Sequence, residues 1–391
     1  MQACQCQRLE LQRVIRRLIR TTAISNSNYT IRQALALAEQ SLWLTSPNPH
    51  VGCILLNDAG HVIGQGHTQQ AGGPHAEVMA LRDAADLGHS VAGATAYVTL
   101  EPCSHHGRTG PCCDALIAAG VQKVVASIAD PNPLVSGQGF ARLRAAGIDV
   151  EVGPGAAESR ALNIGFFSRM VRRTPWVRMK VAASLDGKTA LDNGVSQWIT
   201  SQAARADGHA WRARACAVLT GIGTVLDDNP RLDVRLVDTP RQPVRVVVDS
   251  RLQMPLDAHI LIATSSVYIY AAVPNDAKKS ALEALGARVI YLPDADGKVD
   301  LAAMLRDLGQ RQINELHIEA GEKLNGSLIR AGLVDEFVVY LAPKLVGQGR
   351  GMARFGPLEA LADAVPLEFV STTLLGPDLR IVARIPGRDQ F

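Results

Sequence analysis

Apolar positions in the first part of the chain switch between helical spacing and short continuous runs. Apolar residues at every third or fourth position predict helices over residues 30–44, 76–85 and 112–119. Continuous apolar runs predict buried strands over residues 52–56, 94–100 and 123–128. Strands that alternate with helices in this way are typical of a layered α/β sheet.

The alternation begins again after a basic, proline-containing junction at residues 172–175. Strands are predicted at 176–182, 217–220, 244–249, 267–271, 315–319 and 336–341. Helices are predicted at 201–213, 276–285 and 322–331. We therefore expect an α/β protein with two domains, residues 26–172 and 173–391, preceded by an extension over residues 1–25.

Composition fits this picture and narrows the class of protein. The chain has 391 residues, is 47% hydrophobic and 20% charged, and contains no apolar run long enough to cross a bilayer. Its seven cysteines are an odd number without a secretory leader pattern, which argues against a disulfide framework. We expect a soluble protein of the reducing cytoplasm.

The net charge of +3 comes from the first 25 residues. That segment holds five arginines against Glu10 alone, a charge of +4, so the rest of the chain is −1. No broad nucleic-acid-binding face is expected from this balance. The segment itself fits a transit peptide, an amphipathic helix or an over-extended translation start, and we expect it to be dispensable and poorly ordered.

Four residues suggest a metal-dependent reaction. The stretch 74–77 contains His75 and Glu77, and the stretch 101–112 contains Cys103 and Cys112. One imidazole and two thiolates can hold Zn²⁺ tetrahedrally and leave the fourth position for water. A nearby carboxylate that is not a ligand can then move protons, as in the zinc nucleobase deaminases. Both His75 and Cys112 are predicted at helix starts, where a thiolate is favoured.

The spacing of the cysteines leaves alternatives open. Zinc deaminases usually carry P-C-x-x-C, whereas eight residues separate Cys103 from Cys112 here. Either the site is not a deaminase or it belongs to a branch with a longer loop. Buried cysteines also serve as small hydrophobes, and we assign Cys113 to that role.

Glycines follow two predicted strands of the second half. Gly221 and Gly223 follow one strand and Gly321 follows another, at turns where backbone N–H groups could meet a phosphate. The Rossmann fingerprint is incomplete, and glycines that only form turns explain the pattern equally well. Arginines at 212, 231 and 235 could hold a phosphate or lie solvated on the surface.

A resemblance decides between these alternatives. The motifs H-A-E at 75–77, T-L-E-P-C-S-H-H-G-R-T at 99–109 with Cys112, and D-P-N-P at 130–133 resemble the bifunctional riboflavin-biosynthesis deaminase–reductases. So do K-V-A-A-S-L-D-G-K at 180–188, S-Q-W-I-T-S at 196–201, E-A-G at 319–321 and Y-L-A-P-K-L-V-G at 340–347. The long spacing between the cysteines is the pattern of this family, and the resemblance runs from about residue 28 to the C-terminus.

For the first domain the resemblance implies a cytidine-deaminase-like α/β/α layer. It would deaminate 2,5-diamino-6-ribosylamino-4(3H)-pyrimidinone 5′-phosphate, with zinc on His75, Cys103 and Cys112 and with Glu77 as the proton carrier. The candidates for contacts with the base and the phosphate are Asn48, His67, His105, Arg108, Thr109 and Asn132.

For the second domain the resemblance implies a dihydrofolate-reductase-like α/β fold that reduces the ribosyl group to ribityl with NADPH. The cofactor would be lined by Ala182, Trp198, Thr224, Asp228, Ser250 and Gly321. The substrate would be contacted by Ser196, Arg212, Leu232, Arg235 and Glu319, and Lys180 would assist at the carbon that accepts hydride. The resemblance also implies a homodimer formed through the reductase domains.

Three rival hypotheses predict different features. A nucleic-acid deaminase would need a basic groove in its first domain and no cofactor domain. The near-neutral charge beyond residue 25 and the reductase-like second half argue against this hypothesis. A non-catalytic zinc module conflicts with Glu77 beside three ligands. An enzyme with one active half predicts broken motifs, and both halves carry intact ones.

Overall fold

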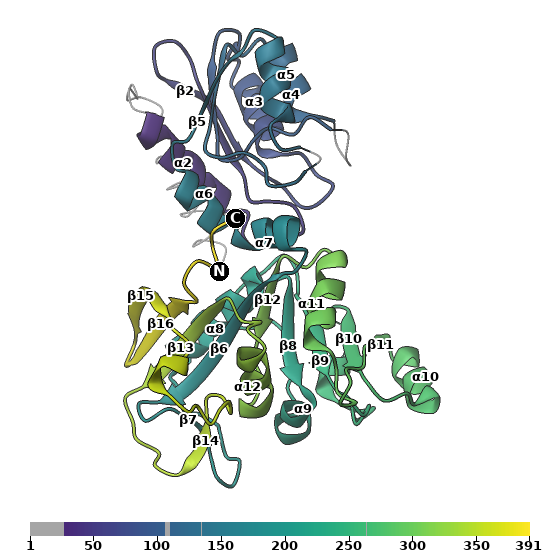
Figure 1. Ribbon diagram of the computed structural model, residues 1–391. Coiled ribbons are helices and arrows are strands. Elements are labelled where there is room, and N and C mark those ends of the chain that lie inside the picture. The colour runs from purple at the N-terminus through teal and green to yellow at the C-terminus, as the bar shows by residue number, and fades with distance from the viewer. Residues whose placement is uncertain (1–26, 106–109, 134, 263) are drawn as a thin grey trace, which may run out of the picture. The chain divides into compact units, whose positions relative to one another are not determined.

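The protein forms two compact units in a computed structural model that describes residues 27–105, 110–133, 135–262 and 264–391 (Figure 1). The first unit ends at Val171 and the second begins at Arg172. The predicted extension over residues 1–25, with its expected disorder, lies outside the described residues. Within the described ranges, no helix has the length and apolar character needed to cross a membrane.

The first unit is a five-stranded sheet with the order β2-β1-β3-β4-β5. β1 runs antiparallel to β2 and β3, whereas β3, β4 and β5 are parallel. Helices α2 and α6 cover one face, and α3, α4 and α5 cover the other (Figure 1). The bounds are α2 Ser27–Glu39, β1 Gly52–Leu56, β2 Val62–His67, α3 Ala76–Asp86, β3 Thr95–Val98, α4 Cys112–Ala118, β4 Lys123–Ala126, α5 Gln138–Ala145, β5 Asp149–Val152, α6 Ala156–Leu162 and α7 Ile164–Arg172.

Glycines let two helices lie directly on this sheet. A Cβ at Gly52 would stand 1.9 Å from the Ala34 carbonyl oxygen of α2. A Cβ at Gly64 or Gly66 would stand 2.3 Å and 2.7 Å from carbonyl oxygens of α3. These separations are shorter than any van der Waals contact, so only glycine fits beneath the helices.

The second unit is built on a nine-stranded sheet with the order β11-β10-β9-β8-β12-β6-β13-β16-β15. The seven strands from β11 to β13 in this order are parallel, and β16 is antiparallel to both of its neighbours. A separate two-stranded sheet pairs β7 with β14. The bounds are β6 Trp176–Ser184, β7 Lys188–Leu191, α8 Gln202–Arg214, β8 Ala217–Gly221, α9 Ile222–Asp228, β9 Val244–Val248, η1 His259–Leu261, β10 Val267–Ala271, α10 Asp276–Ala284, β11 Ala287–Tyr291, α11 Leu301–Gln310, β12 Glu315–Ile318, α12 Glu322–Arg330, β13 Glu336–Ala342, β14 Gly349–Gly351, η2 Leu361–Asp363, β15 Glu368–Leu375 and β16 Asp378–Arg384.

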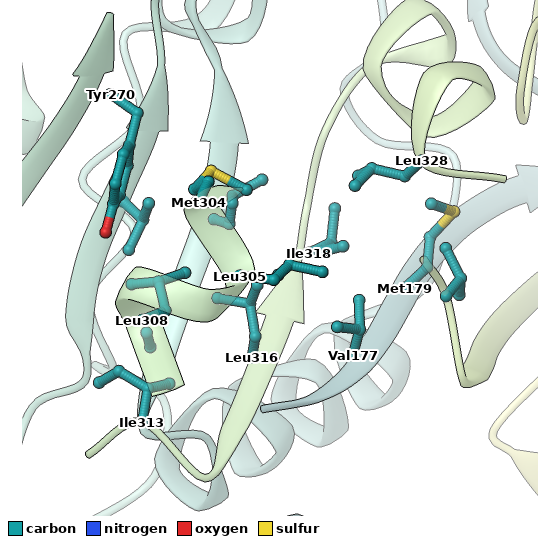
Figure 2. Packing of buried hydrophobic residues seen from close by; sticks show 14 of the residues in the cluster. Val177, Met179, Tyr270, Met304, Leu305, Leu308, Ile313, Leu316, Ile318 and Leu328 are labelled. Atoms are coloured by element: carbon teal, nitrogen blue, oxygen red, sulfur yellow. The ribbon is translucent and has the colours of Figure 1, made fainter. Parts of the chain in front are cut away.

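The core of the second unit lies between this sheet and the amphipathic helices α11 and α12. Met304, Leu305 and Leu308 of α11 pack with Leu316 and Ile318 of β12, as Figure 2 shows. A second buried cluster lies around β9, β10 and α10. Burial on both faces explains why these parallel strands are almost continuously apolar.

Every predicted strand and helix is present, with ends that differ by a few residues. The largest error is the predicted helix 30–44, which ends at Glu39. There the Ser41 hydroxyl donates to the Ala38 carbonyl at 2.7 Å, and residues 40–44 form turns. The sequence pattern missed β2, β5, α5, α6, α7, β7, α9, β11, α11, β14, β15 and β16.

Candidate metal centre and ligand cleft

Three potential metal ligands converge in the first unit. His75 is the N-cap of α3, Cys112 is the first residue of α4, and Cys103 follows β3. His75 Nδ1 lies 3.3 Å from the Cys112 sulfur and 3.6 Å from the Cys103 sulfur. All three ligand atoms lie within 4.8 Å of one another. The fold therefore brings together residues that are 37 positions apart in the sequence.

The geometry of this cluster fits a zinc ion. Zinc binds nitrogen at about 2.0–2.1 Å and sulfur at about 2.3 Å in tetrahedral sites, which places nitrogen and sulfur ligands about 3.6 Å apart. The hydrogen bond from Cys112 outweighs burial and lowers the pKa of Cys103 to about 4, while the same interaction raises the pKa of Cys112. The Cys112 backbone N–H also donates to the Cys103 sulfur at 3.3 Å. The donor set therefore holds at least one thiolate at neutral pH.

Glu77 lies beside this cluster in the first turn of α3 and is 3% exposed. Burial, followed by the charge of Cys103, raises the pKa of its carboxyl to about 7. A carboxyl with this pKa can accept and return a proton near neutral pH. The arrangement therefore supplies a proton carrier next to three metal ligands.

Cys113 has the structural role expected of it. It is buried, and its sulfur donates to the Pro102 carbonyl at 3.1 Å. Burial raises its pKa to about 12, so it stays a thiol. Its neighbour Cys112 alone points to the ligand cluster, because successive residues at a helix start face different directions.

The remaining first-unit candidates are described only in part. Asn48 is half-buried, with its backbone oxygen accepting from Thr45 at 2.8 Å, and His67 contacts the Thr68 carbonyl at 3.1 Å. His105 is exposed and Asn132 is half-buried. The predicted contacts at 108 and 109 lie outside the described residues.

The second unit contains a cleft of about 850 Å³ at the carboxyl ends of its parallel strands. Glycine turns after β8 and β12 form two of its walls, together with residues of β7 and β14. This is where parallel α/β sheets bind ligands. The predicted residues that line it are Ser196, Thr224, Asp228, Glu319 and Gly321.

Glu319, which lines this cleft, belongs to a network of buried charges. The Arg212 guanidinium donates to both oxygens of Glu319, and Lys180 Nζ lies 3.7 Å from the same carboxylate. Burial opposes ionisation of Glu319, but Arg212 and then Lys180 hold the pKa of this carboxyl well below its usual range. Burial lowers the pKa of the Lys180 ammonium. Three of the predicted substrate contacts thus form one charged group.

Two further substrate candidates adjoin this network. Arg212 donates to the Asp233 carbonyl at 2.9 Å, and Arg235 donates to the Asp233 carboxylate at 2.8 Å. Leu232 is buried and has a positive φ of 50°. Leu232 directly precedes the residue whose carbonyl accepts from Arg212.

Three predicted cofactor contacts lie outside the residues that line the cleft. Trp198 is 61% exposed, with the Arg205 guanidinium 4.5 Å from its ring centroid. Ala182 packs in a cluster with Tyr340, and Ser250 Oγ accepts from the Val299 backbone N–H at 3.2 Å.

Sequence reasoning missed several residues at the cleft. Lys323, Arg350 and Arg354 line it and supply positive charge, and Arg350 bridges to Asp227 at 2.8 Å. Lys323 directly follows a predicted strand-to-helix turn, so its position could have indicated it. Arg350 belongs to β14, which no sequence pattern revealed.

Comparison with known proteins identifies both units. Residues 24–128 match the cytidine and deoxycytidylate deaminase zinc-binding region, and residues 175–381 match the RibD C-terminal domain. The riboflavin biosynthesis protein RibD of Escherichia coli K12 is 46% identical over 90% of this chain and 97% of its own length. Its counterpart in Aquifex aeolicus is 40% identical over 91% of this chain and 97% of its own length.

Solved structures agree over almost the whole chain. Acinetobacter baumannii RibD superposes with a TM-score of 0.84 at 41% identity, covering 92% of this chain and 98% of that one. A Thermotoga maritima protein gives a TM-score of 0.82 at 31% identity with the same coverage. It is described as a diaminohydroxyphosphoribosylaminopyrimidine deaminase and 5-amino-6-(5-phosphoribosylamino)uracil reductase.

Proposed function

The chain belongs to the RibD family and is a bifunctional deaminase and reductase of riboflavin biosynthesis, and on this premise we propose which residues carry each reaction. Zinc serves the deaminase and NADPH serves the reductase. The observation that carries the proposal is the cluster of His75, Cys103 and Cys112 beside the buried Glu77.

We propose that residues 26–172 carry out deamination and residues 173–391 carry out reduction. The first reaction converts 2,5-diamino-6-ribosylamino-4(3H)-pyrimidinone 5′-phosphate to 5-amino-6-(5-phosphoribosylamino)uracil and releases ammonia. The second reduces the ribosyl group of that product to a ribityl chain. The description of the Thermotoga maritima relative supports this order of reactions.

In the deaminase domain, His75, Cys103 and Cys112 would hold the zinc. When bound, zinc activates water for attack on the amine-bearing ring carbon. Glu77 would take up the two protons of that water in turn, delivering the first to the ring nitrogen and the second to the leaving amine, a role that its pKa near neutrality supports. The base and the phosphate would be contacted by Asn48, His67, His105, Arg108, Thr109 and Asn132.

In the reductase domain, NADPH supplies the hydride and the protein aligns it with the substrate. Gly321 and Thr224, which line the cleft, would contact the cofactor together with Asp228, Ala182, Trp198 and Ser250. Arg212 and Arg235 would hold the substrate phosphate with Ser196 and Leu232, since guanidinium groups bind phosphate in bidentate fashion. Lys180, held by Glu319 at 3.7 Å, would lie at the carbon that accepts hydride.

We propose that the enzyme is a homodimer formed through the reductase domains. β15 is an edge strand of the nine-stranded sheet, and its Phe369 and Leu374 are each 75% exposed. An exposed apolar edge strand is a surface that another chain normally covers. Phe369→Glu with Leu374→Glu should convert a dimer to a monomer in sedimentation equilibrium, and a monomeric wild type would overturn the proposal.

We also propose a cytoplasmic location and a small-molecule substrate. Cys103 and Cys112 form no disulfide, and neither do the other cysteines in the described residues; a reducing compartment keeps them available for metal. Binding of nucleic acid would need a basic face, which the charge of −1 beyond residue 25 does not favour.

The test of the proposed function uses purified full-length protein of known zinc content. Given the diaminopyrimidine phosphate and NADPH, it should release ammonia and oxidise NADPH. Zinc-stripped protein should do neither with this substrate but should still oxidise NADPH when given the deaminated intermediate. Zinc-loaded protein that neither releases ammonia nor oxidises NADPH would overturn the assignment, and a nucleic-acid substrate would be tested next.

A further inference from the structure

Glu101 is a buried carboxylate that binds four backbone amides. It is 3% exposed and lies two residues before Cys103. One of its oxygens accepts from the N–H groups of Asp130 at 3.1 Å and Gly137 at 2.9 Å. The other accepts from the N–H groups of residues 139 and 140 at 2.9 Å and 3.4 Å. A single side chain thus holds Asp130 and Gly137 of the connection between β4 and α5, together with the first turn of α5.

The start of α5 explains why a carboxylate is needed there. Its N-cap residue is Gly137, which offers no side-chain acceptor to the first turn. The amides of Gly139 and Phe140 belong to that turn and would otherwise be buried without a partner. Glu101 supplies both acceptors, and its charge is favourable at a helix N-terminus. It is therefore the cap of a helix that lies far from it in the sequence.

The backbone around Glu101 is held tightly on both sides. A Cβ on Gly139 would stand 2.1 Å from the Pro102 carbonyl oxygen, so α5 touches the segment directly. On the other side, the Cys113 N–H donates to the Cys103 carbonyl at 3.2 Å. Any displacement of the connection is thus transmitted to the backbone that carries Cys103.

We propose that Glu101 is a positioning residue for deamination. It fixes the connection that carries Asp130 and Asn132 against the backbone of the zinc ligand Cys103. The Asn132 N–H donates to the Asp130 carboxylate at 2.7 Å, and the Asp130 N–H is bound by Glu101. The inference rests on the proposed contact between Asn132 and the substrate, because Glu101 fixes the backbone that carries Asn132 relative to the zinc ligand Cys103.

The first test is Glu101→Gln, which keeps the shape but turns an NH₂ group toward backbone N–H donors. A displacement of about 1 Å at a substrate contact costs about 100-fold. We expect a loss of about that size in deaminase kcat/KM, carried mainly by KM, with wild-type zinc content. Reduction of the deaminated intermediate by the same preparation should be unchanged, and Glu158→Gln, an exposed change on α6, should leave both activities unchanged.

A double-mutant cycle shows whether Glu101 acts through Asn132. In an Asn132→Ala background, adding Glu101→Gln should cost far less than 100-fold in deaminase kcat/KM, because the side chain that Glu101 positions is already gone. Independent, multiplicative losses would overturn the proposal, as would an unchanged KM in Glu101→Gln itself.

If Glu101→Gln loses zinc or fails to fold, Glu101→Asp decides. Aspartate keeps the charge but is one methylene shorter, so it cannot bind Asp130 and the start of α5 at the same time. A raised deaminase KM at full zinc content supports the positioning role. A wild-type KM, or a loss of activity that only follows a loss of zinc, overturns it. Wild-type protein that releases no ammonia would instead overturn the proposed function.

Discussion

Two buried acids near the metal ligands of the first unit and three arginine-paired glutamates of the second have pKa values shifted in opposite directions. In the deaminase unit, burial raises the pKa of Glu77 and of Asp130 to about 7. In the reductase unit, Glu315, Glu319 and Glu336 are also buried, but neighbouring arginines hold their pKa values below the usual range. A buried acid with a pKa near neutrality can exchange a proton, whereas an acid fixed as an anion can only orient cations. Of these acids, Glu77 is the proposed proton carrier of deamination, whereas Glu319 holds Arg212 and Lys180.

The reductase unit carries this pairing beyond its cleft. Arg178 of β6 is 1% exposed and donates to Glu315 at 2.6 Å and to Glu336. Arg214 and Arg384 hold the outer sides of the two carboxylates. Four of these five charges lie on the adjacent strands β12, β6, β13 and β16, and the fifth, Arg214, is the last residue of α8. Buried charges of this kind are stable only while every partner is present.

The largest expected effect concerns the proton carrier of the first unit. Glu77→Gln removes the carboxyl that exchanges a proton but keeps its shape beside the ligands. Deaminase kcat should fall by about 10²–10⁴-fold, the usual contribution of a general acid–base group. Ammonia release measures the loss, and zinc content with NADPH oxidation on the deaminated intermediate serves as the control. Retained deamination would show that the raised pKa of Glu77 has no catalytic meaning.

The next effect concerns the charges around Arg178 in the second unit. Arg178→Met leaves two carboxylates buried with only their outer arginines, which should destabilise the reductase unit by about 3–5 kcal/mol. Hydrogen exchange over β6 and β13 in the intact protein would measure the change. Exchange in the deaminase unit should not change. Wild-type protection of β6 would mean that the outer arginines alone compensate the carboxylates.

A smaller effect separates the two kinds of buried acid by pH. Asp130 has a folded pKa of about 7, raised above its unfolded value of about 3.9. Its contribution to stability is therefore full in acid and is lost as pH rises through about 7. Glu336 has a lowered folded pKa, so its contribution is present above about 4.3 and is lost only in stronger acid. Between pH 5.5 and 8, the stability of wild type relative to Asp130→Asn should fall, because neutral Asn stands in for the protonated acid. The stability of wild type relative to Glu336→Gln should stay constant over the same range. Hydrogen exchange measured separately in the two units would detect this difference. If both stability differences changed with pH in the same way, the two buried acids would not differ as proposed.

The smallest effect is at an exposed ion pair of the deaminase unit. Lys123 lies 2.9 Å from Glu151 across the parallel strands β4 and β5, with both side chains more than a third exposed. Lys123→Met should change stability by about 0–1 kcal/mol, because water and salt screen such pairs. A loss of stability as large as that of Arg178→Met would show that burial does not explain the difference between this ion pair and the charges around Arg178.

Local patterns were enough to predict the ligands and their helices. His75 and Cys112 were placed at helix starts because capping and apolar periodicity extend over a few residues. Arg350 could not be found in this way, since the three-residue β14 exists only through pairing with β7, about 160 residues earlier. The role of Glu101 escaped for the same reason, because its partners lie 29 to 39 residues later in the chain. Contacts between residues far apart in the sequence produce no periodic pattern of apolar residues.

The two glycines of β2 have a consequence for protein engineering. Gly64 and Gly66 let the backbone of α3 rest on the strand, and the start of α3 carries His75 and Glu77. The height of that helix above the sheet therefore sets where the imidazole and the carboxyl stand. A designer who grafts the H-x-E motif onto another α/β scaffold must also transfer two positions that have no side chain at all. A search for transferable active sites that compares only reactive groups would leave them out.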